Sequence, residues 1–324
     1  SLQKMAGPQL RHVLGAMTTN RFTGILTGTF ITAAVQSSTA TTVMTVSFVN
    51  AGLLTLAQAI SVIMGANIGT TLTAWIMSAG FSFNITDFVW PAFFIAILLI
   101  YSKKRKILGD FIFGVSFMFL GLGTLRQTGI DMDLAHNQPV LAFFSSFDPS
   151  SFTTTLVFLL IGSLLTMCVQ SSAAIMAITM ILCSNGVLPI YQGIALVMGE
   201  NIGTTVTSNL AALTANTQAR RAAFAHMFFN MFGVVWVLCI FKPFIDMVCG
   251  FVGYDETITK ADPNFLANTA KLSFVLAAFH TTFNVANTLV LVGFIPQMEK
   301  IVCKVIRPRM QNDEDDFRLR FIQT

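Results

Sequence analysis

The same polar peptide occurs twice in this chain, each time inside strongly apolar sequence. Adding 134 to a residue number carries Gln36-Ser37-Ser38 onto Gln170-Ser171-Ser172 without a gap, and it carries MGANIGTTLT (64–73) onto MGENIGTTVT (198–207). Two separate polar motifs that stay in register over this length indicate an internal duplication. The chain is therefore expected to fold as two related halves, and each half must place the same polar residues in an apolar setting.

Apolar segments of helical length dominate the composition. Of the 324 residues, 54% are hydrophobic and only 10% are charged, with a mean hydropathy of +0.71, whereas soluble domains carry roughly a quarter charged residues. The clearest spans lie at 88–101, 108–125, 222–241 and 271–293. Because these runs are helical in length and well separated, they predict transmembrane helices and not the strands of a barrel. We expect an all-α polytopic membrane protein.

Basic clusters fix the orientation of the helices through the positive-inside rule. This rule places KKRK (103–106), Arg220-Arg221 and RPR (307–309) in the cytoplasm. The span 108–125 then leaves the cytoplasm, so an odd number of crossings must separate the following external loop from Arg220-Arg221. Two apolar pieces lie in that interval. One of them must therefore enter and leave on the same side.

The piece with QSS at its centre, about 153–186, is the natural re-entrant hairpin, with its polar tip at membrane depth. It enters from outside. Its counterpart at about 20–52 follows Lys4 and Arg11 and begins near Arg21, so it enters from the cytoplasm. We expect two inverted-topology repeats, each with a re-entrant helical hairpin and a broken transmembrane helix, which is the architecture of many secondary transporters.

The predicted domain organisation follows the duplication. Repeat 1 covers 1–107, repeat 2 covers 108–241, a loop and a final transmembrane helix cover 242–300, and a cytoplasmic tail or linker covers 301–324. Within repeat 1 we expect a hairpin at about 20–52, a broken helix at about 55–80 and a span at 88–101. Within repeat 2 we expect a span at 108–125, a hairpin at about 153–186, a broken helix at about 188–214 and a span at 222–241. The first repeat lacks the opening span of the second, which predicts a further helix before Ser1. The charged run 312–324 predicts a linker into a cytoplasmic domain.

The hairpin tips have the composition of an anion site. A broken helix leaves free backbone N–H groups at the start of its second half, and the helix dipole favours an anion there. Many neutral donors with little fixed positive charge suit a tetrahedral oxyanion. The alternative is that these hydroxyls only mediate helix packing. The candidate donors are Gln36, Ser37, Ser38, Thr39 and Thr41 in the first copy and Gln170, Ser171 and Ser172 in the second.

The GxNIGTT motifs have the composition of a cation site. Gly65, Gly69, Gly199 and Gly203 are expected to break the helix and release carbonyl oxygens, and neutral oxygens around an unwound helix suit Na⁺. The alternative is a glycine-mediated close crossing of two helices. Glu200, which replaces Ala66 between the copies, is a cation ligand, a protonatable site or a solvated residue. The candidate sodium ligands are Asn67, Thr70, Thr71, Thr73, Glu200, Asn201, Thr204, Thr205 and Thr207.

Two His/Asn pairs repeat a helical spacing. His226 and Asn230 in HMFFN, and His280 and Asn284 in HTTFN, are each four residues apart and share a helix face. We interpret them as polar contacts between helices. The five cysteines form no close pair, which indicates neither a disulfide framework nor a zinc site. We expect no cofactor, no metal beyond Na⁺ and no nucleic-acid partner.

Taken together, the duplicated QSS hairpins, each followed by GxNIGTT, and the stretch RRAAFAHMFFN (220–230) resemble the type II sodium-phosphate cotransporter family in a bacterial form. The resemblance covers about residues 1–300. It implies inorganic phosphate as substrate, bound at the two QSS sites, and Na⁺ as coupling ion, with the GTT motifs assisting its coordination. The family's motif is usually QSSS, whereas Thr39 and Ala173 stand here at the fourth position. The resemblance also implies a PhoU-like helical domain after residue 324, and a homodimer is a candidate assembly.

The expected function is Na⁺-coupled phosphate uptake by alternating access in the bacterial cytoplasmic (inner) membrane, with the C-terminus in the cytoplasm. Three rivals stay open: a symporter of another anion such as sulfate or a dicarboxylate, a membrane protein that senses phosphate, and a membrane-embedded hydrolase. The hydrolase is disfavoured because the two motifs contain no histidine to serve as a base. We therefore expect a transporter and not an enzyme.

Overall fold

The structure is a computed structural model that describes residues 15–82, 86–102, 104–133, 136–149, 151–259 and 261–308. Every regular element within these residues is a helix. The helices are α2 (Arg21–Val35), α3 (Ser38–Asn50), α4 (Leu56–Ser82), α5 (Thr86–Ile100), α6 (Lys106–Asp131), α7 (Gln138–Ser145), α8 (Phe152–Val169), α9 (Ser172–Ser184), α10 (Ile190–Ala211), α11 (Thr217–Cys239), α12 (Phe241–Val252), α13 (Phe265–Ala270), α14 (Leu272–Leu291), η1 (Val292–Phe294) and α15 (Ile295–Val305).

The predicted duplication appears as the same helix arrangement in each half. In the first half α2 and α3 form a pair that turns back at Gln36-Ser37, and α2 packs along α4. In the second half α8 and α9 turn back at Gln170-Ser171, and α8 packs along α10. A glycine with positive φ follows each pair, Gly52 at 69° and Gly186 at 67°, where other residues would be strained. The helix order and the left-handed turn residues therefore occur at equivalent positions in the two halves.

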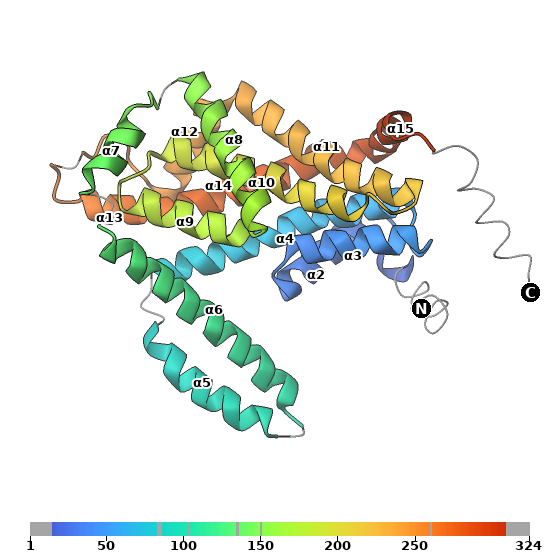
Figure 1. Cartoon of the computed structure of the whole chain (residues 1–324), viewed down its shortest axis with the longest axis horizontal. Helices are drawn as coiled ribbons and strands as arrows, with labels where there is room; N and C mark the ends of the chain where they lie inside the picture. Colours follow the sequence, from blue (N-terminus) through green and yellow to red (C-terminus); the bar gives the residue numbers. More distant parts are fainter. Residues whose placement is uncertain are drawn as a thin grey trace, which may run out of the picture.

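Four helices form the centre of the molecule. The two long helices α4 and α10 each pack against both α11 and α14, and Figure 1 shows α4 running beneath the second-half helices. Two clusters of buried apolar side chains lie around these helices. One is centred on α9, α10 and α14, and the other on α3, α4 and α11. The core thus joins the two halves and does not separate them.

The prediction that the GxNIGTT motifs break their helices is wrong. Both α4 and α10 are continuous through the motif. The glycines instead permit close helix crossings, because a Cβ built on Gly65 would lie 1.9 Å from the carbonyl oxygen of Ile25, and one built on Gly199 would lie 2.0 Å from that of Leu159. The alternative of a close crossing is the one found.

Polar ties reinforce both crossings at equivalent positions. The Thr29 hydroxyl contacts the Gly65 carbonyl oxygen at 3.0 Å, and the Ser163 hydroxyl contacts the Gly199 carbonyl oxygen at 3.0 Å. Each hydroxyl also lies 2.9 Å from a carbonyl oxygen four residues earlier in its own helix. The first helix of each hairpin is therefore fixed to the long helix that follows it.

Five helical segments within the described residues are long and apolar enough to cross a membrane: Leu56–Phe81, Lys106–Asp131, Phe152–Val169, Thr217–Cys239 and Phe265–Val305. The predicted span 88–101 coincides with α5, a shorter apolar helix. Figure 1 shows α5 and α6 together projecting away from the other helices. The fold is that of an all-helical, multi-pass membrane protein.

The segment 242–300 contains more helix than the single one expected. It also holds α12, whose Ile245 is fully buried, and the short α13, while α15 continues to Val305 beyond the predicted start of the tail. The predicted linker 312–324 lies outside the described residues, as do Lys4, Arg11 and Lys103, which served to orient the chain.

Candidate functional site

The first hairpin turns at two residues with specific backbone conformations. Helix α2 ends where Gln36 adopts a left-handed conformation, with φ of 57°, and the Gln36 N–H donates to the Thr32 carbonyl at 2.7 Å. Ser37 is extended and caps α3, because its hydroxyl oxygen accepts from the Ala40 N–H at 3.2 Å. Since the Ser37 oxygen acts here as an acceptor, its hydroxyl hydrogen remains available to a ligand.

The second hairpin repeats this geometry residue for residue. Gln170 has φ of 58° and donates to the Thr166 carbonyl at 2.8 Å. Ser171 caps α9 by accepting from the Ala174 N–H at 3.2 Å. Each tip thus presents a serine-capped helix N-terminus, whose first N–H groups have no acceptor within the helix.

A threonine on the following long helix holds each tip glutamine. Thr73 on α4 donates to Gln36 Oε1 at 2.9 Å, and Thr207 on α10 donates to Gln170 Oε1. The two glutamine amides also donate to carbonyls near the ends of their own helices, Gln36 to Ala33 and Gln170 to the residue three before it. The tips are therefore fixed to α4 and α10 by side chains as well as by glycine packing.

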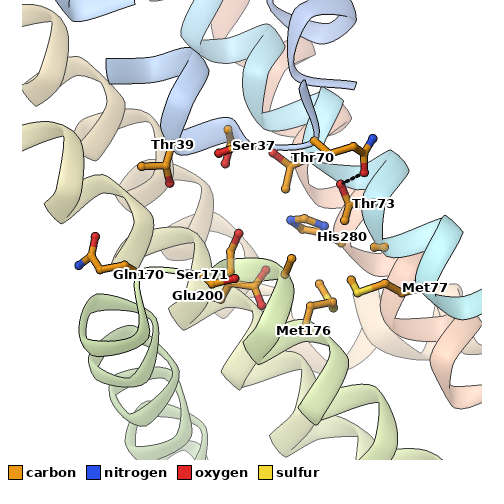
Figure 2. A pocket seen from close by; sticks show the side chains of 15 residues that line it. Ser37, Thr39, Thr70, Thr73, Met77, Gln170, Ser171, Met176, Glu200 and His280 are labelled. Atoms are coloured by element: carbon orange, nitrogen blue, oxygen red, sulfur yellow. Dashed lines mark hydrogen bonds between the residues drawn. The ribbon is translucent and has the colours of Figure 1, made fainter. Parts of the chain in front are cut away.

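Both tips line one cavity of about 80 Å³. Figure 2 shows Ser37 and Thr39 on one side of it and Gln170 and Ser171 on the other. A cavity of this size has room for several waters or for one small tetrahedral anion. No lysine or arginine is among the described residues that line it, and its ionisable groups are one carboxyl group and one imidazole. The lining residues are Gln36, Ser37, Ser38, Thr39, Thr70, Thr73, Ala74, Met77, Gln170, Ser171, Ser172, Ala173, Met176, Glu200 and His280.

The structure brings together seven of the eight candidate anion donors. The residues Gln36, Ser37, Ser38, Thr39, Gln170, Ser171 and Ser172 all line this cavity. Thr41 does not. It is 2% exposed, donates to the Ser37 carbonyl at 3.1 Å and accepts from Thr32 at 3.0 Å. Its role is to hold the first turn of α3.

The predicted sodium ligands are divided between the cavity and the helix interfaces. Thr70, Thr73 and Glu200 line the cavity. The hydroxyls of three others, Thr71, Thr204 and Thr205, donate to carbonyls within their own helices at 2.7 to 2.9 Å. The Thr207 hydroxyl instead donates to Gln170 at the second hairpin tip. Since both helices are continuous, released main-chain carbonyls do not add to this set.

The two motif asparagines contact the His/Asn pairs. Asn67 donates to Asn230 at 2.9 Å and its Oδ1 lies 3.3 Å from His226 Nε2, while Asn201 Oδ1 lies 3.2 Å from His280 Nε2. The interpretation of the pairs as polar helix contacts therefore agrees with the structure. Sequence reasoning missed that His280 also lines the cavity. The recurrence of His-x-x-x-Asn was the available signal.

Known proteins resemble the chain along most of its length. A sequence model of the Na⁺/Pi-cotransporter family matches residues 1–127 and 149–252. The "Putative inorganic phosphate export protein YjbB" of Escherichia coli is 26% identical over 315 residues, 96% of this chain and 53% of that protein. The "Uncharacterized protein YqeW" of Bacillus subtilis is 30% identical over 255 residues, 78% of each chain. The "Sodium-dependent phosphate transport protein 2A" of Ovis aries is 41% identical over 73 residues, 22% of this chain and 11% of that protein.

The chain spans about half the length of the phosphate export proteins that it matches, 53% of the Escherichia coli protein. No solved structure matches it. The family match covers most of the chain and includes both hairpin tips and both GxNIGTT helices. The chain belongs to the Na⁺/Pi-cotransporter family.

Proposed function

We propose that the chain is a secondary transporter that couples Na⁺ to the uptake of inorganic phosphate by alternating access, in the cytoplasmic membrane of a bacterium. One observation carries the proposal. Two serine-capped helix N-termini, one from each copy of the duplication, line the same cavity. Helix N-termini attract anions through their free N–H groups and the helix dipole.

Phosphate fits the donors available at the tips. The hydroxyl oxygens of Ser37 and Ser171 accept from the backbone, so their hydrogens are free to donate to phosphate oxygens. Gln36 and Gln170 each have a second amide hydrogen beyond the one donated to the backbone. Hydrogen bonds to a charged acceptor are about twice as strong as those between neutral groups. The two tips together therefore supply several strong bonds to one tetrahedral anion.

Sodium supplies the positive charge that the cavity lacks. The Thr70 and Thr73 hydroxyls donate to Ala66 and Gln36, so it is their oxygen lone pairs that remain for a ligand. Oxygen lone pairs suit a hard cation. The same two helices carry Asn67, Asn201 and the remaining motif threonines, which we propose surround the sodium ligands without lining the cavity. Coupling then arises because each ion makes the cavity more favourable for the other.

The hairpins provide the proposed route for alternating access. Helix α2 has 15 residues, about 22 Å at about 1.5 Å per residue, which is shorter than the ~30 Å hydrocarbon core of a bilayer. Such a pair of helices reaches membrane depth and returns, which supports a re-entrant hairpin in the first repeat. For the second repeat, whose α8 is long enough to cross, the re-entrant hairpin is proposed from its equivalent turn at Gln170-Ser171. One half then moves against the other around a site near the midplane.

Phosphate export is a second candidate, because the name of the Escherichia coli relative describes export. A symporter runs in the direction set by its gradients, so the same cavity serves either flux. The two functions differ in the side from which Na⁺ must be supplied.

The test is uptake of radiolabelled phosphate into proteoliposomes that contain this chain. An inward Na⁺ gradient is expected to drive accumulation, and an equal K⁺ gradient is the matched control. Preloaded phosphate that leaves only along an outward Na⁺ gradient would support export. Equal fluxes with Na⁺ and K⁺ would refute sodium coupling, and phosphate binding without any flux would favour a sensor.

A further inference from the structure

The two halves differ by one ionisable residue in an otherwise repeated motif. Glu200 on α10 occupies the position that Ala66 occupies on α4. Glu200 is 1% exposed, lines the cavity, and its Oε2 has no hydrogen-bond partner. A buried polar atom without a partner is costly unless a ligand satisfies it. The second half therefore brings to the cavity an acceptor that the first half lacks.

The histidines show the same asymmetry. His226, which contacts Asn67 of the first-half motif, has its Nδ1 3.1 Å from the Ser208 hydroxyl. The repeat equivalent of Ser208 is Ala74, and correspondingly His280 Nδ1 has no partner. His280 and Glu200 both line the cavity, as Figure 2 shows. Both residues that keep an unpartnered atom therefore line the proposed anion site, and Glu200 supplies a carboxyl oxygen, which can accept a hydrogen bond.

When it is ionised, a carboxyl group beside an anion site distinguishes oxyanions by their protons. Sulfate carries no proton near neutral pH, so it presents only lone pairs and negative charge to Glu200. Phosphate keeps at least one P–OH group under the same conditions, and that group donates a hydrogen bond. We propose that Glu200 accepts the hydrogen of the phosphate P–OH and thereby makes the cavity selective for phosphate over sulfate. This inference rests on the proposed phosphate site.

The size of the expected discrimination follows from the loss of that bond. A site built to hydrogen-bond a substrate hydroxyl rejects an analogue that lacks it by roughly 10⁴-fold. A sulfate oxygen would also face the carboxylate oxygen with no hydrogen between them, which leaves both buried acceptors unsatisfied. Arsenate is a tetrahedral oxyanion that keeps its protons as phosphate does, so the cavity should accept it. The wild-type chain is therefore expected to show inhibition of phosphate uptake by arsenate and none by a hundredfold excess of sulfate.

Two substitutions test the role of Glu200. Glu200→Gln has nearly the same shape but adds an amide donor, so sulfate should become an inhibitor, with its inhibition constant lowered about 100-fold or more. Glu200→Asp keeps the carboxylate, so sulfate should stay excluded even if phosphate binds more weakly. Unchanged sulfate exclusion in Glu200→Gln would overturn the proposal, as would sulfate inhibition of the wild-type chain. A shift of the Na⁺ dependence alone would also overturn it and identify Glu200 as a cation ligand.

Binding keeps the test independent of transport. A bound anion raises the unfolding temperature of the chain in detergent by mass action, so phosphate, arsenate and sulfate can be compared in a variant that no longer transports. Sulfate should stabilise Glu200→Gln and leave the wild-type chain unaffected. Equal stabilisation of both chains by sulfate would refute the selectivity. Failure of the proposed function looks different, because phosphate itself would then neither bind nor move in the wild-type chain.

Discussion

Ser171→Ala tests whether the hairpin tip binds the anion directly. The Ser171 oxygen caps α9 by accepting from the Ala174 N–H at 3.2 Å. The hydroxyl hydrogen is unused within the protein and is available to phosphate. The substitution therefore removes two interactions, one that stabilises the helix and one that binds the ligand.

The two losses have separable magnitudes. Loss of a serine cap costs about 1 kcal/mol of stability when alanine replaces it but only a few tenths when glycine does. Loss of a hydrogen bond to a charged group costs about 1.5–3 kcal/mol, which corresponds to a roughly tenfold to hundredfold rise in the KM for phosphate. Ser171→Ala should show both effects, and Ser171→Gly should show the change in KM with little loss of stability.

The assay compares phosphate uptake with the unfolding temperature of each variant. Asn137→Ala is the matched control, because Asn137 caps α7 by accepting from the Val140 N–H at 3.3 Å and does not line the cavity. It should lower stability without changing the KM. If Ser171→Gly retains the wild-type KM while Ser171→Ala does not, the hydroxyl serves only as a cap and the proposed anion site is refuted.

Two further predictions concern the packing of the long helices. Gly199→Ala should destabilise the fold by about 3 kcal/mol or more, because its Cβ would lie 2.0 Å from the Leu159 carbonyl oxygen. Gly114→Ala is the control, since its Cβ would meet nothing within 4 Å, and it should be neutral or stabilise the fold by up to ~1 kcal/mol. Equal unfolding temperatures for the two variants would contradict the close crossing. Asn67→Ala should lower the free energy of unfolding by about 1–3 kcal/mol more than Asn201→Ala. The reason is that both the nitrogen and the oxygen of the Asn67 amide are hydrogen-bonded, while Asn201 Nδ2 has no partner. Thermal unfolding of both variants checks this, and equal losses would show that the two asparagine amides are equally well hydrogen-bonded.

The hairpins could be predicted from the sequence because their signal is local. A helix that must stop at a polar peptide and restart after it needs an N-cap, and serine is among the best N-cap residues. The duplication then doubled that signal at Ser37 and Ser171. The membrane orientation of the hairpins stays a prediction, since it depends on basic residues and on a bilayer.

The role of the motif glycines could not be predicted in the same way. A glycine permits an unusual backbone conformation and also a close approach of another main chain. The choice at Gly65 was decided by the Ile25 carbonyl, which lies on a different helix. The contact of His280 with the cavity was hidden for the same reason, because the register between α14 and α10 is set by tertiary packing.

The close crossings also determine how stiff each half is. Where α2 meets α4 and α8 meets α10, a carbonyl of one helix lies against a glycine of the other, so main chain touches main chain and no side chain can change rotamer to absorb a displacement. Sliding within either pair would force a carbonyl into a Cα and break the threonine or serine tie beside it. The first helix of each hairpin and its long helix are therefore expected to move as one rigid piece. Any motion is expected between the two pieces, and residues of both line the cavity.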